Sequence, residues 1–160
     1  MDAKNPVSNS SPQSQSPKVT FESDAVQSYL NILQEVIARM ASNSANCKTW
    51  CISLVSAILV VIADKNKPNY AWISLIPIVL FFLLDSYYLG QERSFRQIYN
   101  DFVKELHSCG EVTIDKLFVL KPPKGMNVVN LLFASSLSFS IYPFYLTLIV
   151  TVIIARYLIL

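Results

Sequence analysis

Six polar residues, Asp64-Lys65-Asn66-Lys67-Pro68-Asn69, separate two long and predominantly apolar stretches of this 160-residue chain. A linker this short and polar has room only for a tight bend, so the stretches on either side of it must run antiparallel. Each stretch approaches the length that a helix needs to cross a bilayer. The sequence therefore predicts a transmembrane helical hairpin with spans over about residues 47–63 and 70–89.

The overall composition indicates the same class of protein. Hydrophobic residues make up 52% of the chain, charged residues 15%, and the mean hydropathy is +0.40. These values are unlike those of an ordinary soluble domain, so we expect an all-α integral membrane protein whose main solvent is lipid. The net charge is only +2, which argues against a global electrostatic attraction to nucleic acid.

Apolar residues at helical spacing continue the pattern beyond both spans. One stripe precedes the first span: Val26, Tyr29, Leu30, Leu33, Val36, Ile37 and Met40. A second stripe follows the other span: Phe95, Ile98, Tyr99, Phe102, Val103 and Leu106. Folding the hairpin about its bend pairs residues whose numbers sum to about 133, and this register brings the two stripes together. We therefore expect a long-helix hairpin over 24–107 that continues below the membrane as an antiparallel pair of cytosolic helices.

Two further segments flank this hairpin on its cytosolic side. Residues 1–23 are rich in Ser, Pro, Asn and Gln in their first part and are expected to form a disordered N-terminal tail. Residues 108–126 are expected to form a cytosolic connector, in which the alternating piece Val112 to Leu120 fits either a strand or an irregular loop.

The last segment, residues 127–160, is longer than one perpendicular span requires. Serines followed by Pro143 divide it, which predicts an interfacial helix over about 127–139 and a third span from about Ile141 to Ile159. Three spans place the C-terminus outside. If this last run is instead re-entrant, the C-terminus returns to the cytoplasm.

The distribution of basic residues predicts the orientation of the hairpin. The first loop holds Lys65 and Lys67, whereas the segment between the second and third spans holds Arg93, Arg96, Lys104, Lys116, Lys121 and Lys124. Loops rich in Lys and Arg remain in the cytoplasm, so the N-terminus and residues 90–126 are expected there.

One acidic residue, Asp85, lies inside an otherwise apolar span, and the register places it opposite Lys48. An intramembrane carboxylate is costly and therefore a candidate functional group. Two interpretations remain open. Asp85 and Lys48 form a structural ion pair, or Asp85 lines a pore and biases passage toward cations.

Three arginines just below the spans, Arg39, Arg93 and Arg96, form a second group of candidates. Guanidinium groups suit phosphate oxygens, so these residues are a candidate site for a phosphate-bearing ligand. A solvated surface, or one that faces lipid headgroups, explains the same residues.

Signals for catalysis are weak. The three cysteines lack zinc-site spacing, His107 is the only histidine, and the sequence contains no phosphate-binding glycine loop or nucleophile motif. We therefore expect no catalytic residues, no metal site, no cofactor and no enzymatic activity.

Two stretches carry a resemblance to a known family. They are Ala38-Arg39-Met40-Ala41-Ser42-Asn43-Ser44 followed by Lys48 and Trp50, and Leu84-Asp85-Ser86-Tyr87-Tyr88-Leu89-Gly90-Gln91-Glu92-Arg93-Ser94-Phe95-Arg96. The chain resembles the small multi-span membrane effectors that bacteria encode beside nucleotidyltransferases in antiviral defence loci, such as the Hailong-type membrane effector. It is more loosely similar to two-span effectors controlled by nucleotide second messengers.

The resemblance implies a homo-oligomeric channel or pore in the bacterial inner membrane. Its opening would depolarise the cell, under control of a nucleotide or oligonucleotide made by a partner nucleotidyltransferase. On this reading Asp85 shapes the conducting path or its supporting network, and Arg39, Arg93 and Arg96 belong to the regulatory surface. Two alternatives stay open: a non-conducting anchor or scaffold that holds a soluble partner through the cytosolic helices, and a subunit of a transporter.

Overall fold

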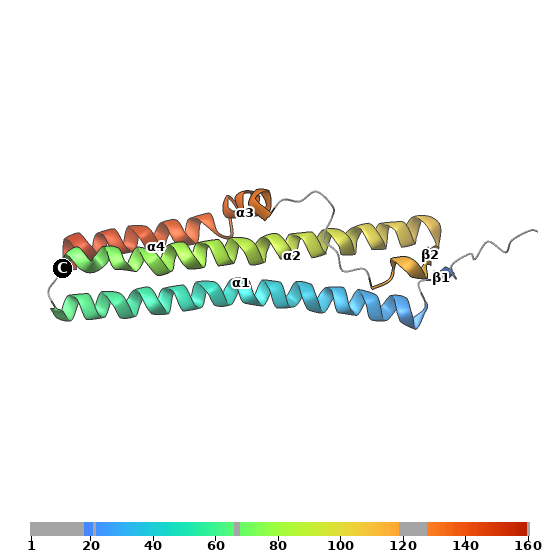
Figure 1. Ribbon diagram of the computed structural model, residues 1–160, viewed down its shortest axis with the longest axis horizontal. Coiled ribbons are helices and arrows are strands. Elements are labelled where there is room, and N and C mark those ends of the chain that lie inside the picture. The colour runs from blue at the N-terminus through green and yellow to red at the C-terminus, as the bar shows by residue number, and fades with distance from the viewer. Residues whose placement is uncertain (1–17, 21, 66–67, 119–127, 160) are drawn as a thin grey trace, which may run out of the picture.

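The computed structural model describes residues 18–20, 22–65, 68–118 and 128–159, and it is mostly helical (Figure 1). Its α-helices are α1 (Asp24–Lys65), α2 (Leu75–Cys109), α3 (Val128–Ser136) and α4 (Tyr142–Ile154). Its shorter elements are the strands β1 (Lys18–Thr20) and β2 (Glu111–Thr113), the 3-10 helices η1 (Pro68–Ser74) and η2 (Ile114–Lys116), and the π-helical turn η3 (Ala155–Ile159).

Helices α1 and α2 lie side by side along their whole lengths and form the predicted hairpin (Figure 1). Two contacts far apart along the hairpin define its register. The amide of Gln34 donates to the Tyr99 hydroxyl at 3.1 Å, and Lys48 pairs with Asp85. Both pairs match the predicted register, which is therefore confirmed.

The local sequence explains where the two long helices begin and end. No proline or glycine occurs between Asp24 and Lys65, so nothing interrupts α1. The second apolar stretch begins differently from the expectation, because residues 68–74 form 3-10 turns and the α-helix begins only at Leu75. Pro77 then lies in the first turn of α2, where its missing N–H has no intrahelical acceptor to lose.

The hairpin has two halves of different character. We call residues 47–65 and 68–89 the apolar half, and residues 24–46 with 90–109 the stalk. In the stalk, the two predicted stripes meet in one core that includes Tyr29, Leu33, Phe102 and Leu106. The rings of Tyr29 and Phe102 pack edge to face, with centroids 4.9 Å apart. The predicted packing of the two stripes against each other is therefore confirmed.

A small antiparallel sheet closes the stalk end, and the expectation of a disordered tail is wrong for residues 18–20. Strand β1 pairs with β2 in the register Lys18↔Thr113, Val19↔Val112 and Thr20↔Glu111. Composition predicted disorder because the segment has too little apolar surface to offset its chain entropy, but β2 of the connector supplies backbone hydrogen-bond partners that order residues 18–20. The chain is therefore not purely helical, and residues 1–17 lie outside the described part.

The C-terminal helices follow the hairpin back to its turn. Helix α3 contacts α2, and α4 then runs along the apolar half of α2 and continues through η3 (Figure 1). Arg156 donates to the Asn69 side chain at 3.4 Å, and its guanidinium lies 4.7 Å from the ring centroid of Trp72. Described residues 142–159 thus reach the hairpin turn without doubling back, while 119–127 of the expected connector lie outside the described residues.

We expect Gly110→Ala to lower the free energy of unfolding by about 1 kcal/mol. Gly110 ends α2 in the left-handed conformation, with φ of +68°, and its N–H donates to the Leu106 carbonyl at 2.9 Å. A Cβ placed there meets no atom within 4 Å, so the cost comes from the backbone conformation alone. Thermal unfolding of the purified protein measures it, with Ser108→Ala in the preceding turn as the control. A variant as stable as the parent contradicts this account.

Candidate functional site

The principal polar site lies where the apolar half meets the stalk. Asp85 of α2 is completely buried, and the Lys48 ammonium of α1 lies 2.6 Å from its Oδ2. The Ser44 hydroxyl, one turn before Lys48, donates to Asp85 Oδ1. Lys48 also donates to Ser44 Oγ at 3.3 Å, so the three side chains form a closed triangle between the two helices. We call Ser44, Lys48 and Asp85 the junction triad.

Burial explains why this arrangement needs all three groups. An unpaired buried carboxylate costs several kcal/mol, and Lys48 and Ser44 compensate both oxygens of Asp85. The Lys48 side chain remains 21% exposed, whereas that of Asp85 is 0% exposed. Within one protomer, the carboxylate therefore forms an ion pair in the interior of the hairpin and does not reach its surface. The sequence motif that contains Ser44 indicated no role for it. Its position four residues before Lys48 places both side chains on the same face of α1.

The three candidate arginines have different surroundings. Arg93 donates to the Ser138 hydroxyl at 2.7 Å and to the Ala134 carbonyl at 3.5 Å, so it holds α3 and the following turn against α2. Arg96 pairs with Glu92 of its own helix at 2.8 Å. Arg39 is exposed on α1. The structure thus gives Arg93 a tethering contact to the C-terminal segment and does not gather the three guanidinium groups around one point.

A groove in the stalk contains one of these arginines. It has a volume of about 360 Å³ and is lined by Gln34, Ile37, Ala38, Ala41, Arg96, Tyr99 and Asn100. The hydrogen bond from Gln34 to Tyr99 links the two helices here. An aromatic ring, two amides and a guanidinium beside aliphatic side chains suit a ligand that is partly planar and partly anionic. Sequence reasoning proposed Tyr99 only as a docking position for a soluble partner and did not single out Gln34 or Asn100, although the hairpin register places all three together.

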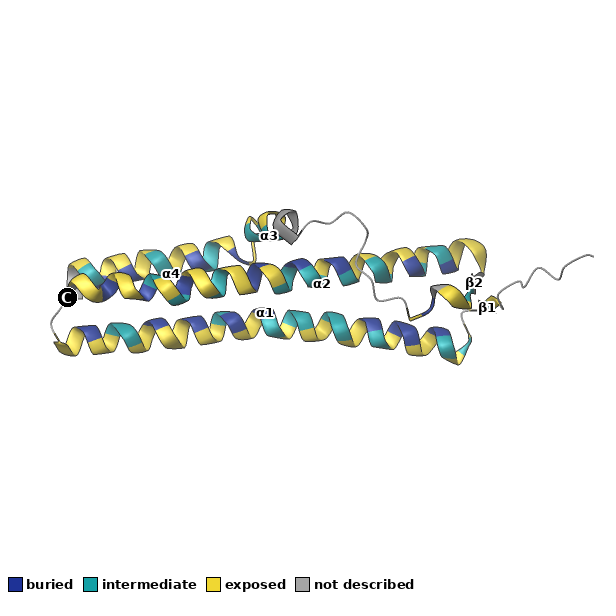
Figure 2. Cartoon of the chain, in the orientation of Figure 1, coloured by how far each residue is buried: buried dark blue, intermediate teal, exposed yellow. Residues whose placement is uncertain are grey.

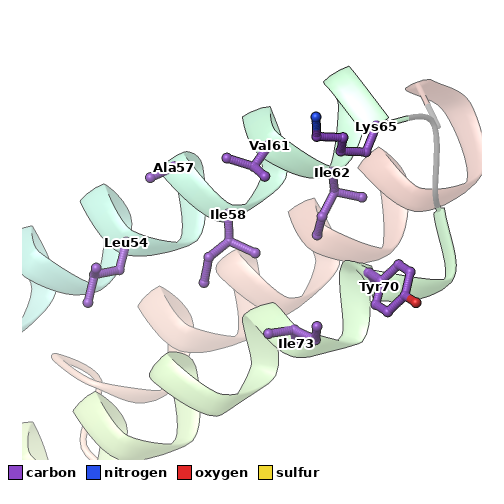
Figure 3. Close-up of a pocket in the computed structure, with 8 residues that line it drawn as sticks. All are labelled: Leu54, Ala57, Ile58, Val61, Ile62, Lys65, Tyr70 and Ile73. Carbon is purple, nitrogen blue, oxygen red and sulfur yellow. The ribbon is translucent and has the colours of Figure 1, made fainter.

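A second groove lies at the hairpin turn and is almost entirely apolar (Figure 3). Its volume is about 450 Å³, and its lining residues are Leu54, Ala57, Ile58, Val61, Ile62, Lys65, Tyr70 and Ile73. Only Lys65 and Tyr70, at the turn, carry polar groups. Such a surface suits hydrocarbon chains and offers no convergent polar groups for a soluble ligand.

The cysteines and the acidic residues do not form a metal centre in the part of the chain that the structure describes. No group of three or more His, Cys, Asp or Glu side chains there lies close enough to hold a metal ion. Cys47 and Cys51 are buried in the hairpin, at 6% and 0% exposure, and Cys51 belongs to the apolar core cluster that also contains Val55 and Ile78. Because both thiols are free and buried, we assign these two cysteines, which lie one helical turn apart, a role in packing.

Many residues of the apolar half are exposed (Figure 2), and large hydrophobic side chains are prominent among them. In the most apolar 18-residue stretch of α1, only 22% of the residues are buried. In the corresponding stretch of the helical segment Asn69–Cys109, 33% are buried. A core helix of a soluble protein would be mostly buried, because exposed apolar patches of this size are unfavourable in water. The exposed residues include Trp50, Val60, Val61, Trp72, Ile76, Val79, Leu80 and Leu83.

Together, the fold and the junction triad define a mostly helical hairpin protein with two helices that are long and apolar enough to cross a membrane. Comparison with protein-family models, with curated proteins and with solved structures finds no match to this chain.

Proposed function

We propose that this chain is a multi-pass protein of the bacterial inner membrane, with the N-terminus and the stalk in the cytoplasm. The exposed apolar side chains around the hairpin turn support insertion of that half into lipid. Helix α4 lies at the same level and ends beside the turn, which supports a third span and an external C-terminus. The stalk, by contrast, exposes charged side chains that suit water, among them the basic residues Arg39, Arg93, Arg96 and Lys104.

Within that membrane, the chain acts as a homo-oligomeric channel or pore-forming effector. Three spans are too few to surround a water-filled path, so several copies of the chain must together form its wall. The large apolar surface left exposed by one protomer provides room for contacts between copies as well as for lipid. Opening of the channel would depolarise the membrane, which is how an effector of antiphage defence stops an infected cell.

The observation that carries this proposal is the position of the junction triad. A buried charge pair links α1 to α2 at the level where the lipid-facing half gives way to the stalk. A shift between the stalk helices would strain this pair, and such a polar link can transmit the shift into the membrane. The stalk groove beside Arg96 and Tyr99 provides a place for a controlling nucleotide or oligonucleotide, made by a nucleotidyltransferase encoded alongside.

Membrane potential tests the proposal directly. A voltage-sensitive dye would be followed in bacteria that express the chain with and without the neighbouring gene. We expect depolarisation by the chain, and we expect the neighbour either to trigger or to suppress it. An unchanged potential under every condition, with the protein verified in the inner membrane, would contradict a channel.

The second candidate is a non-conducting anchor or scaffold that holds a soluble partner through the stalk. The stalk groove favours it, since its amides, ring and guanidinium also suit a protein partner. Filling the groove with Ala38→Trp separates the two functions, because Ala38 lines the groove and is exposed on α1. For an anchor, this variant loses the partner and the membrane potential never changes. For a channel, it alters the response of the potential to the neighbouring gene.

A further inference from the structure

The exposed face of α1 in the apolar half carries hydroxyl groups where lipid-facing side chains would be expected. Thr49, Ser53 and Ser56 follow one another at helical spacing, and all three are exposed. They lie on the side of α1 opposite Cys47, Cys51 and Val55, which face the hairpin interior. Asn46 and Ser42 extend the same exposed face toward the stalk. A polar stripe thus runs from the stalk side into the apolar half as far as Ser56, and Val60, one turn further along the same face, is hydrophobic and 69% exposed.

The second arm of the hairpin, formed by η1 and α2, exposes no serine or threonine among its described residues in this half. Its serines in this half, Ser74 and Ser86, are buried at 0% and 1% exposure. Its exposed side chains are instead hydrophobic: Tyr70, Trp72, Ile73, Ile76, Val79, Leu80, Leu83, Leu84 and Tyr87. Both helices lie at the same level, so their depth cannot explain the difference. Helix α1 also exposes hydrophobic side chains, among them Trp50, Val60 and Val61, so the hydroxyl groups form one strip of its outer surface. Over its described residues, the second arm of the hairpin has no such strip.

Helix α4 adds two hydroxyl groups to the polar face. Thr147 and Thr151 are exposed, one turn apart, and line a groove of about 490 Å³ between α1 and α4. Ser56 lines the same groove from α1. Hydroxyl groups from two separate segments of the chain, Ser56 of α1 and the two threonines of α4, thus share one groove, whose other lining side chains are apolar. We call Thr49, Ser53, Ser56, Thr147 and Thr151 the hydroxyl face.

The hydrogen bonds of these side chains determine what the face presents. Ser53 donates to the Thr49 carbonyl at 2.9 Å, and Thr49 donates to that of Ala45 at 3.3 Å. Thr147 and Thr151 donate to the carbonyls four residues earlier at 2.8 and 2.9 Å. Each donated proton points back at the helix, so the oxygen lone pairs remain directed outward. These lone pairs can accept hydrogen bonds from water and can contact small cations.

We propose that the hydroxyl face lines the water-filled path of the assembled protein, where copies of this chain face one another around a common axis. Hydrated monovalent cations are the class of solute that these outward oxygens suit, since neutral acceptors replace part of a hydration shell without trapping the ion. The hydrophobic face of α2 meets the lipid. This inference rests on the proposed channel for conduction, but exposure of the face to water can be measured by itself.

The test compares Ser53→Cys with Leu80→Cys, in a parent that already carries Cys109→Ser. Leu80 is 55% exposed, and the hairpin register places it at the depth of Ser53 on the other helix. Cys47 and Cys51 are buried in both variants, so the parent without an added cysteine measures their background. Membrane vesicles that contain each protein are treated with a charged, membrane-impermeant thiol reagent, and the labelled fraction and the ion current are recorded.

We expect Ser53→Cys to react at least about tenfold faster than Leu80→Cys, because a thiol in hydrocarbon meets neither the reagent nor hydroxide. Modification of Ser53→Cys should also reduce the cation current, while the current through Leu80→Cys stays unchanged. Equal labelling, or faster labelling at Leu80, overturns the assignment even if the protein conducts. Fast labelling of Ser53→Cys without any current supports the water-filled face and contradicts the channel, so the two failures are distinguishable.

Discussion

Replacing Lys48 with methionine is expected to destabilise the protein by about 3–5 kcal/mol, and by more than the replacement of Asp85 with alanine. Lys48→Met leaves the Asp85 carboxylate completely buried, with the Ser44 hydroxyl as its remaining polar contact in the triad. Asp85→Ala leaves the Lys48 ammonium, whose side chain is already 21% exposed and flexible enough to extend toward water. Removal of the lysine should therefore lower the stability more than removal of the aspartate does.

The measurement is the thermal unfolding of detergent-solubilised protein, together with the yield of assembled protein in the membrane. Lys65→Met is the matched control, because Lys65 lies at the turn, 70% exposed and 3.8 Å from an equally exposed Asp64. The double variant Lys48→Met with Asp85→Leu should recover most of the loss, since no buried charge remains.

A second readout separates a structural ion pair from a pore-lining carboxylate. Asp85→Asn keeps the shape of the side chain and removes its charge. If Asp85 lines a pore, this variant should assemble normally and change the conductance or toxicity. The buried triad predicts instead a loss of assembled protein. Full assembly with altered ion selectivity would contradict the enclosed position of the carboxylate.

Replacing Phe102 with alanine is expected to cost about 3–5 kcal/mol and to open the stalk without releasing the apolar half. The Phe102 ring is buried in the stalk core, packs edge to face on Tyr29 and belongs to the same cluster as Val26 and Leu33. Tyr29 in turn packs on Phe118 of the connector, at 5.8 Å between ring centroids. Loss of the Phe102 ring thus loosens both the helix pair and the segment that carries β2.

Hydrogen exchange resolves this prediction by region. We expect faster exchange over 24–40 and 95–118 and unchanged exchange over 50–60, because the two halves have separate cores. Phe102→Leu, which retains most of the buried volume, is the control and should cost about 1 kcal/mol. Uniformly faster exchange throughout the hairpin would show that the halves unfold together.

The hairpin, its register and the meeting of its two stripes were predictable because they follow from local pattern. The polar bend at Asp64 to Asn69 dictates antiparallel helices, and helical spacing then determines which side chains face each other. The opposition of Lys48 and Asp85 follows from that register alone and is present in the structure.

The partner of Arg93 and the pairing of β1 with β2 were not predictable in this way. Arg93 contacts Ser138, forty-five residues away, and nothing in the spacing of either residue indicates the other. Residues 18–20 pair with residues 111–113, although the whole hairpin lies between them in the sequence. Such contacts depend on how separate segments pack, and a short strand carries too little pattern to identify its partner.

Two long apolar helices, a tight turn and a polar continuation could be predicted from the chain alone, because period and hydrophobicity are properties of a single segment. Which polar groups are enclosed and which are exposed follows only from the packing of the helices. Asp85, Ser74 and Ser86 lie inside, whereas Ser53 and Ser56 lie outside. The physical reason is that burial depends on the helix packed against each face, and one segment's sequence does not specify that neighbour.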